Sequence, residues 1–353
     1  MGADRRLTLQ TIADALGVSR TTVSNAYNRP DQLAPELRER ILDKARELGY
    51  AGPDPAARRL RSGRPDAFGL LFTEDLRYAL TDPAAALFLQ GVADAADGAG
   101  MSLLLVTARA ADAARQVRDA VVGAFCAYSL PDDHPAVLAV LERGVPLVVA
   151  DEPRIAGASF LGIDDRAGAR AVAAHVAGLG HRRIAIIADR LRPDDYRGPV
   201  DAERRRLASF AIWRERLEGI GDALAAAGVS IDDVPIEERE GNVIGLGCDA
   251  AEALLERDPR PTALVALTDQ LALGALKACR RRGLRVPEDV SVTGFDDVPD
   301  AEEQGLTTVR QPLAEKGRVA GELLVEAVAG RPPREIRLPV ELVVRASTGP
   351  PAG

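Results

Sequence analysis

The sequence predicts two kinds of fold in one chain: a small all-α domain at the N-terminus and a much larger α/β body. Apolar residues recur at helical spacing in the first part of the chain, whereas from Phe68 onward short apolar runs of strand length alternate with helical stretches. The charge divides in the same way. Residues 1–64 carry 12 Arg and Lys against 8 Asp and Glu, although the whole chain of 353 residues has a net charge of −8. A basic head on an acidic body suits a protein that contacts phosphate with one end.

The composition narrows the class of protein. Hydrophobic residues make up 46% of the chain, which is enough to bury large cores. The cysteines, Cys126, Cys248 and Cys279, are too few and too scattered for a disulfide framework or a metal site, and the three histidines are equally dispersed. No apolar run reaches the roughly 18 residues of a membrane helix, and the N-terminus has no signal-peptide core. We therefore expect a cytoplasmic protein that uses no membrane segment, metal or cofactor.

Three short helices account for the head. Thr8 is a suitable N-cap for a helix that runs to Leu16, and Ser19 is a suitable N-cap for a second helix that runs to Asn28. A third helix begins at Pro35, a residue favoured in the first helical turn. The first two helices are separated only by a tight turn that contains glycine. This arrangement predicts a helix-turn-helix.

The second helix begins with polar residues that can read DNA. Because the two helices cross steeply, the start of the second one projects from the surface and can enter a major groove. Its exposed polar positions are Arg20, Thr21 and Asn25. Arginine pairs with guanine, asparagine pairs with adenine, and the threonine methyl group contacts the thymine methyl group. The residues alone leave open the alternative that all three are ordinary surface residues of a helix.

The run LTLQTIADALGVSRTTVSNAYNRPDQLAPELRERILDKARELGY closely resembles the head of the LacI/GalR family of regulators. Its first part follows the family pattern TxxxIAxxxGVSxxTVSxxxN, and its long last helix ends in Gly-Tyr, as family members do. The resemblance implies a DNA-binding transcriptional regulator, with a repressor as the expected type, in which Arg20, Thr21 and Asn25 read bases. It also places four residues near DNA phosphates: Thr8, Ser19, Thr22 and Asn28.

Two positions depart from the family pattern. Many relatives carry a basic residue where this chain has Asn25, so we expect the outer bases of its operator to differ from the commonest family sites. Ala34 stands where a serine that caps the third helix is usual.

After Tyr50 the sequence is rich in proline, glycine and arginine around one short helical candidate, residues 55–61, which is too short to be stable alone. In the family this segment is a hinge helix that orders when two copies pair over the minor groove and wedge a leucine between base pairs. Leu60 occupies that place, with Ala57 and Arg58 beside it. A flexible linker is the alternative. The expected domains are a DNA-binding domain over 1–52, a hinge over 53–65 and an effector-binding and dimerisation domain over 66–353.

From Phe68 onward the sequence predicts two Rossmann-like parallel-sheet subdomains. The strand-length runs are FGLLF, MSLLLV, AFCAY and PLVVA in the first, and RIAIIA, VPIEER, TALVAL and VSVTG in the second. Strands that alternate with helices are connected by crossovers and therefore lie parallel. Such sheets bind ligands at the carboxyl ends of their strands, so two facing subdomains enclose a cleft. The family resemblance extends over this region, which is similar to periplasmic sugar-binding proteins.

Polar residues that end these strands are candidates for the cleft. Carboxylates and arginine accept from and donate to the hydroxyl groups of neutral polyols. The resemblance makes effector contacts of Asp151, Arg216, Thr268 and Asp296, and further candidates after the first strand are Thr73, Tyr78 and Asp82. Thr268 replaces an asparagine of sugar-binding relatives. Helix capping and surface salt bridges are the alternative roles for these residues.

These observations predict a homodimer that binds a palindromic operator in double-stranded DNA, associates with the nucleoid and is controlled allosterically by a sugar or a nucleoside-like effector. An enzyme is not expected, because the sequence contains no phosphate loop, nucleophile elbow or GxGxxG motif, and no catalytic residue is assigned. A secreted solute-binding protein would share the body but would need a signal peptide and no head. Residues 189–212 form a longer connection than the fold requires, and we expect it to cover the cleft or to face a partner.

Overall fold

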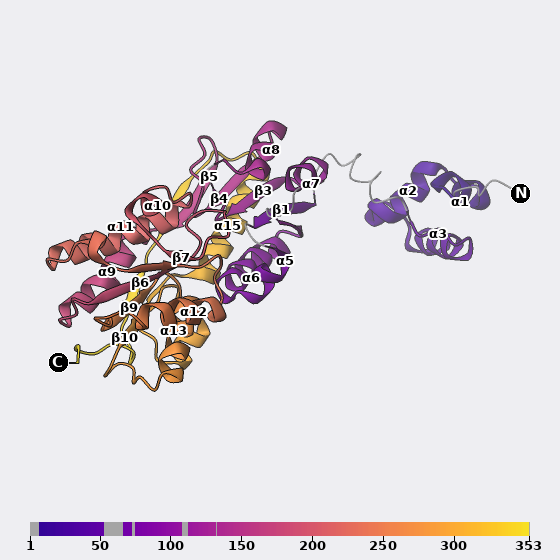
Figure 1. Cartoon of the computed structure of the whole chain (residues 1–353). Coiled ribbons are helices and arrows are strands. Elements are labelled where there is room, and N and C mark those ends of the chain that lie inside the picture. The colour runs from indigo at the N-terminus through magenta and orange to yellow at the C-terminus, as the bar shows by residue number, and fades with distance from the viewer. Residues whose placement is uncertain (1–6, 53–65, 73–74, 108–111, 132, 353) are drawn as a thin grey trace, which may run out of the picture. The chain divides into compact units, whose positions relative to one another are not determined.

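The computed structural model describes residues 7–52, 66–72, 75–107, 112–131 and 133–352. The chain separates into two compact units between residues 65 and 66, and each is described by itself (Figure 1). The hinge candidates Ala57, Arg58 and Leu60 and the cleft candidate Thr73 lie outside the described residues. No helix within the described ranges is both long enough and apolar enough to cross a bilayer.

The first unit is a bundle of three helices. They are α1 (Leu9–Leu16), α2 (Arg20–Asn28) and α3 (Pro35–Glu47), with a single 3₁₀ turn, η1 (Pro30–Gln32), between the last two. Ile12, Val23 and Ile41, one from each helix, are completely buried in the shared core. The predicted helix boundaries in this unit are confirmed, because strong local signals fix them.

Caps and a glycine set the turn between α1 and α2. The Thr8 hydroxyl accepts a hydrogen bond from the backbone N–H of Thr11, and the Ser19 hydroxyl accepts one from the N–H of Thr22 at 3.0 Å. Gly17 ends α1 with φ 65°, a left-handed conformation that glycine adopts without strain. Three residues, Gly17 to Ser19, are therefore enough to connect α1 with α2.

The second unit contains two subdomains. The first subdomain is built on a six-stranded parallel sheet with the strand order β12-β5-β4-β3-β1-β2. Its strands are β1 (Ala67–Phe72), β2 (Ser102–Thr107), β3 (Ala124–Tyr128), β4 (Leu147–Ala150), β5 (Ser159–Ile163) and β12 (Glu335–Leu338). The four inner strands are almost wholly buried because helices cover both faces, which explains their continuous apolar runs. Its helices are α5 (Leu76–Thr81), α6 (Pro83–Gly98), α7 (Ala113–Asp119), α8 (Pro135–Arg143) and α15 (Leu313–Val328).

The second subdomain is built on a five-stranded sheet with the order β10-β9-β6-β8-β7, in which only the edge strand β7 is antiparallel to its neighbour. Its strands are β6 (Ile184–Ala188), β7 (Gly198–Pro199), β8 (Ile236–Glu238), β9 (Ala263–Ala266) and β10 (Ser291–Thr293). Its helices are α9 (Asp165–Gly178), α10 (Ala202–Arg206), α11 (Ala211–Ala226), α12 (Ile244–Leu255), α13 (Asp269–Arg281) and α14 (Pro299–Glu303), with a 3₁₀ turn, η2 (Ile231–Asp233). A small antiparallel pair, β11 (Thr308–Arg310) and β13 (Glu341–Val343), contacts α9.

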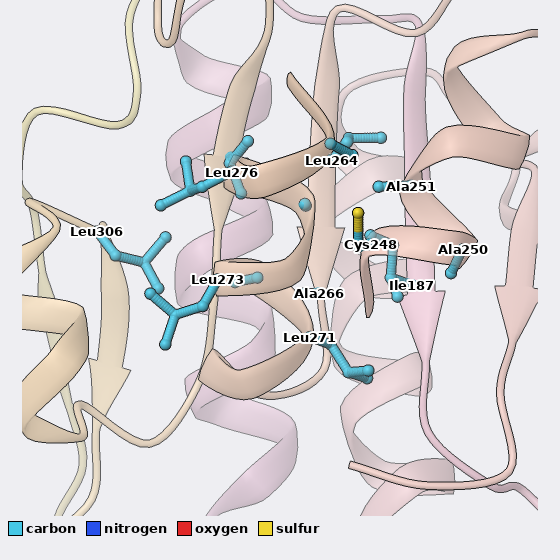
Figure 2. Packing of buried hydrophobic residues seen from close by; sticks show 14 of the residues in the cluster. Ile187, Cys248, Ala250, Ala251, Leu264, Ala266, Leu271, Leu273, Leu276 and Leu306 are labelled. Atoms are coloured by element: carbon cyan, nitrogen blue, oxygen red, sulfur yellow. The ribbon is translucent and has the colours of Figure 1, made fainter. Parts of the chain in front are cut away.

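Glycine allows the helices that cover this second sheet to pack closely. Helices α12 and α13 cross at Gly247 and Gly274, where an added Cβ atom would overlap the backbone of the facing helix. Around the crossing lie small and medium apolar side chains, among them Cys248, Ala251 and Leu271 (Figure 2). Because the two helices lie so close together, small side chains are enough to fill the space between them, and alanine-rich segments still form a close-packed core.

The chain passes between the two subdomains three times. It leaves the first after β5, returns to it between β11 and α15, and leaves it again between β12 and β13. The predicted fold class is thereby confirmed in its main features. The sequence analysis did not predict β5, α15 or β11 to β13, however, so it missed the return of the chain to the first subdomain.

Candidate functional site

The start of α2 is exposed in the helical unit. Arg20 and Thr21 are exposed and Asn25 is partly exposed, and none of these three side chains forms a hydrogen bond or ion pair with another described residue. The side chains of the phosphate candidates are held locally. Ser19 Oγ lies 2.8 Å from Thr22 Oγ1, and Asn28 donates to Ser24 Oγ at 3.1 Å. The helix therefore presents three polar side chains that remain available to an external partner.

The second unit contains a cleft of about 800 Å³ between its subdomains, including the part that opens to solvent. Residues that follow β1, β3 and β4 form one wall, and residues that follow β6 and β9 and the start of α11 form much of the other. The predicted candidates Tyr78, Asp82, Asp151, Arg216, Thr268 and Asp296 all line it. Further lining residues that the sequence analysis did not assign include Phe72, Tyr128, Asp189, Arg190, Trp213, Asn242 and Gln311.

Asp151 is paired with a buried lysine. It follows β4 with φ 70°, and its carboxylate oxygens lie 3.0 and 2.8 Å from Lys316 Nζ on α15. Lys316 is 1% exposed, and it also donates to Gln311 Oε1 at 2.7 Å. A buried ammonium group needs such partners, so Lys316 fixes both side chains at the floor of the cleft.

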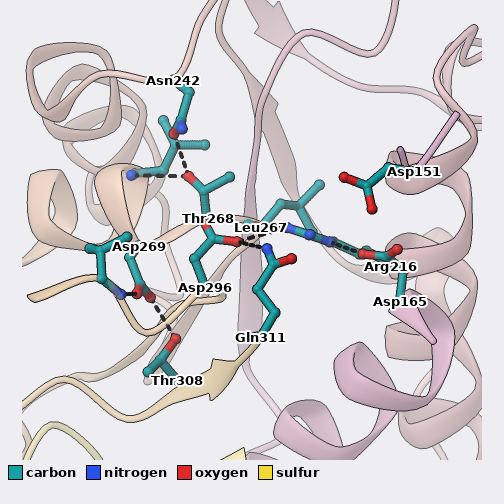
Figure 3. Close-up of polar contacts among 12 residues, drawn as sticks. Asp151, Asp165, Arg216, Asn242, Leu267, Thr268, Asp269, Asp296, Thr308 and Gln311 are labelled. Carbon is teal, nitrogen blue, oxygen red and sulfur yellow. Dashed lines mark hydrogen bonds and ion pairs between the residues drawn. The ribbon is translucent and has the colours of Figure 1, made fainter. Parts of the chain in front are cut away.

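The same chain of contacts continues into the second subdomain. Gln311 Nε2 donates to Asp296 Oδ1 at 2.6 Å, and Arg216 Nη1 lies 3.8 Å from that oxygen (Figure 3). Asp296 is 4% exposed and follows β10. Asp151 and Asp296, from opposite subdomains, are thus connected through Lys316 and Gln311.

Arg216 is anchored on the far side of this chain. Its Nε donates to Asp165 Oδ1 at 2.8 Å, and its Nη1 donates to the carbonyl oxygen of Leu267 at 2.6 Å. The guanidinium group also lies over the Phe295 ring, 3.6 Å from its centroid, and 5.1 Å from the Trp213 ring. With these contacts the orientation of Arg216 is fixed before any ligand binds.

A second set of hydrogen bonds spans the cleft. Thr268 caps α13 and donates to Asn242 Oδ1 at 2.6 Å (Figure 3). Asn242 Nδ2 in turn donates to Asp82 Oδ2 at 3.0 Å. Asp82 belongs to the first subdomain, where its other oxygen caps α6 through the N–H of Ala85. Thr268 is therefore both a helix cap and a cleft residue.

Burial changes the ionisation of two cleft carboxyl groups. It raises the pKa of Asp82 to about 7, against the opposing effect of the Ala85 N–H. Burial also raises the pKa of Asp296 to about 6, although Arg216 and Gln311 stabilise the charged form. Burial therefore favours the protonated forms of both groups, which reduces the negative charge of the cleft.

This arrangement suits recognition of hydroxyl groups. Fixed carboxylates accept hydrogen bonds, an oriented guanidinium group and amide groups donate them, and the aromatic rings of Phe72, Tyr128 and Trp213 offer apolar surfaces. The residues of the site that the sequence analysis did not assign differ in whether the sequence could have indicated them. Asp189 directly follows a predicted strand, so the rule that found Asp151 would also have found it, whereas Gln311 and Lys316 belong to the unpredicted return of the chain.

The long connection after β6 is folded onto the second subdomain. It contains β7 and α10, and Arg204 of α10 forms ion pairs with Asp194 at 2.8 Å and with the buried Glu238 at 2.5 Å. Arg190 and Phe210, near its two ends, line the cleft. The expectation that the whole connection covers the cleft stays a prediction.

Comparisons with known proteins fit both units. Residues 8–52 match the family described as bacterial regulatory proteins, lacI family, and residues 173–348 match a periplasmic binding protein-like domain. An HTH-type transcriptional regulator of Mycobacterium tuberculosis, Rv3575c, is 46% identical over 354 residues, which cover 99% of this chain and 98% of the relative.

Solved structures give the same correspondence. The transcriptional regulator CelR in complex with cellobiose is 32% identical, with a TM-score of 0.70, and the match covers 97% of this chain and 100% of CelR. The lac repressor dimer bound to operator and the anti-inducer ONPF is 26% identical, with a TM-score of 0.75, over 97% of this chain and 99% of the repressor.

Proposed function

The chain belongs to the LacI family of bacterial transcriptional regulators, and from that premise we propose that it is a repressor that binds a palindromic operator as a homodimer and responds to an uncharged, hydroxyl-rich ligand. The observation that carries the proposal is the buried chain of contacts from Asp151 through Lys316 and Gln311 to Asp296. A ligand bound to its ends contacts both subdomains at once. It therefore favours one relative arrangement of them, which is what control of a distant DNA-binding unit requires.

In this proposal the two α2 helices of a dimer enter successive major grooves, where Arg20, Thr21 and Asn25 read bases. Thr8, Ser19, Thr22 and Asn28 contact phosphates. The exposure of α2 supports these roles. The domain division is part of the same proposal: a DNA-binding domain over 1–52, a hinge over 53–65 and an effector-binding domain over 66–353.

The hinge contacts the minor groove in this proposal, with Leu60 as a wedge between base pairs and Ala57 and Arg58 beside it. Replacing the wedge isolates its contribution. Leu60→Ala weakens operator affinity about 100-fold while ligand affinity stays unchanged, as measured by DNA retardation and by calorimetry. An operator affinity equal to that of the parent protein would refute the wedge.

An apolar surface on the first subdomain supports the homodimer. Leu76 and Leu80 of α5 and Leu104 of the neighbouring edge strand β2 are 45%, 62% and 38% exposed. Exposed large apolar side chains next to a sheet edge favour a covering partner, and a second copy offers the same side chains in return. Leu80→Arg is expected to shift the protein from dimer to monomer in sedimentation experiments and to weaken operator binding as a consequence. The exposed Leu141→Arg on α8 is the control.

The charges of the cleft favour a neutral ligand. Asp151 is paired with Lys316, Asp296 is close to Arg216, and burial raises the pKa of Asp82 to about 7, so much of the negative charge of these three residues is offset. Together with the aromatic lining this supports a sugar or a nucleoside-like molecule. Tyr78, Arg216 and Thr268 are further contacts in this proposal, as is Thr73.

Trp213, the only tryptophan of the chain, makes the ligand proposal testable without labels. Neutral sugars, cyclic polyols, nucleosides and sugar phosphates are titrated while Trp213 fluorescence is followed, and ligands that bind are then added to the DNA retardation assay. We expect a neutral hydroxyl-rich compound to bind and to alter operator affinity. Binding of sugar phosphates alone, or binding without an effect on DNA affinity, would overturn the proposal.

We further propose that the protein acts by binding alone, as a cytoplasmic, nucleoid-associated regulator. The cleft carboxyl groups of Asp151 and Asp296 are engaged by fixed partners, Lys316 and Gln311, which leaves them poorly placed to transfer protons in a reaction. An incubation with each ligand that binds, followed by mass spectrometry, is expected to return the ligand unchanged.

A further inference from the structure

Helix α11 supplies two cleft side chains, Trp213 and Arg216, but its first turn has no cap of its own. Its N-cap residue, Phe210, has an apolar side chain and makes no capping hydrogen bond. The first backbone N–H groups of any helix lack partners within the helix and must find them elsewhere. The position of α11 therefore depends on a group from outside its own sequence.

That group comes from the other subdomain. Glu152 follows β4, and its Oε2 accepts a hydrogen bond from the backbone N–H of Ala211, the first residue of α11. The N–H of Ile212 also hydrogen-bonds the carboxyl group and lowers its pKa. Glu152 itself is held in the first subdomain, where its N–H donates to the carbonyl oxygen of Ala150 at 3.0 Å. An oxygen that accepts a hydrogen bond from the first N–H of a helix is a capping group, so this contact is a helix cap that joins the two subdomains.

The burial of the Glu152 carboxyl group costs free energy and therefore opposes the capping contact. Glu152 is 1% exposed, and its second oxygen, Oε1, has no hydrogen-bond partner among the described residues. Burial raises the pKa of Glu152 well above its ordinary range, and the nearby carboxylates of Asp151 and Asp165 raise it further. Separation of the subdomains would hydrate this carboxyl group but would leave the first N–H groups of α11 without a cap. Because the cost of burying the carboxyl group offsets the gain from capping the helix, this contact is suited to form and break reversibly.

We propose that Glu152 is a positioning residue that caps α11 only while the subdomains are arranged as in this structure, and that it thereby couples this closed arrangement to the placement of Trp213 in the cleft. Its regulatory meaning rests on the proposed control by a ligand. The capping contact itself requires neither ligand nor DNA, so it can be tested in their absence.

The test is hydrogen exchange on the full-length, ligand-free protein and on two variants. Glu152→Met keeps the length of the side chain but removes the acceptor, whereas Glu152→Gln keeps an acceptor oxygen. We expect the amides of Ala211 and Ile212 to exchange about tenfold faster in Glu152→Met and at the parent rate in Glu152→Gln. Quenching of Trp213 fluorescence by acrylamide is expected to increase in the methionine variant alone.

The amide of Ala167 is the internal control. It is capped by Asp164 at 2.8 Å within the second subdomain, so its exchange stays unchanged in both variants. Unchanged protection of Ala211 in Glu152→Met would overturn the proposal, as would equal loss in both variants. Faster exchange at Ala167 as well would also overturn it, because it would indicate general loosening. A failure to find a ligand or an operator would overturn the proposed function and leave this result standing.

Discussion

The helical unit and the α/β unit carry their functional groups in opposite ways. The base-reading candidates lie on one helix, α2, and none of their side chains forms a hydrogen bond or ion pair with another described residue. The cleft residues come from distant parts of the chain. Asp82, Arg216 and Asp296 are each less than a tenth exposed, and each is held by a hydrogen bond to another buried polar residue. The difference teaches that binding and stability are separable in the first unit and inseparable in the second.

The largest effect should come from the base-reading residues. In the double variant Arg20→Ala/Asn25→Ala, operator affinity is expected to fall about 1,000-fold, because two base-specific contacts are lost together. The free energy of unfolding should change by less than about 0.5 kcal/mol, since both residues lie on the surface. Fluorescence anisotropy with operator DNA and urea denaturation measure the two quantities. Arg40→Ala, an exposed arginine on α3, is the control and should cost only a few-fold in affinity. A double variant that still selected the parent's operator would break the comparison.

The next effect concerns the buried lysine of the cleft. Lys316→Met leaves Asp151 without its ammonium partner and Gln311 without a donor, and we expect a loss of about 3 kcal/mol in the free energy of unfolding of the α/β unit. Lys277→Met, at an exposed position of α13, should change it by less than about 0.5 kcal/mol. Urea denaturation followed by Trp213 fluorescence compares the two. Equal stabilities would mean that the cleft is as independent of the fold as the base-reading helix.

The smallest effect is a dependence of stability on pH. The folded-state pKa of Asp82, about 7, lies above its ordinary value of 3.8, so folding favours the protonated form. This contribution is fully present below pH 4 and is lost as the pH rises through 7, at a rate of about 1 kcal/mol per pH unit for one such group.

The variant Asp82→Asn tests whether Asp82 causes this pH dependence, because the amide can still cap α6 but cannot ionise. Thermal denaturation between pH 5 and pH 8 should show a flatter stability curve for this variant than for the parent protein. Asp164→Asn, an exposed cap of α9, should leave the curve unchanged. If the Asp82 variant kept the full slope, other groups would have to account for it.

Sequence reasoning succeeded where local signals act alone. The helices of the first unit begin at Thr8 and Ser19 caps and at Pro35, and these signals lie next to the elements that they define. Strand ends are similarly local. Parallel sheets bind ligands at the carboxyl ends of their strands, and this rule correctly predicted that Asp151, Thr268 and Asp296 line one cleft.

What the sequence could not supply depends on contacts between distant segments. Nothing near Lys316 indicates that α15 returns to the first subdomain and faces Asp151, more than 150 residues earlier in the chain. Asn242 was missed for a related reason. It lies in a loop, and its hydrogen-bond partner across the cleft, Asp82, belongs to the other subdomain, so only the folded arrangement brings the two residues together. Pairings of this kind follow from topology and not from periodicity.

The three passages of the chain between the subdomains have a consequence for synthesis. Strand β12 and helix α15 complete the first subdomain, but they are translated after the whole five-stranded sheet of the second. The three-helix unit can fold soon after it leaves the ribosome, whereas the sheet that begins with β1 must wait for residue 338. A nascent chain would thus possess a finished DNA-reading head long before it possesses a complete sensor.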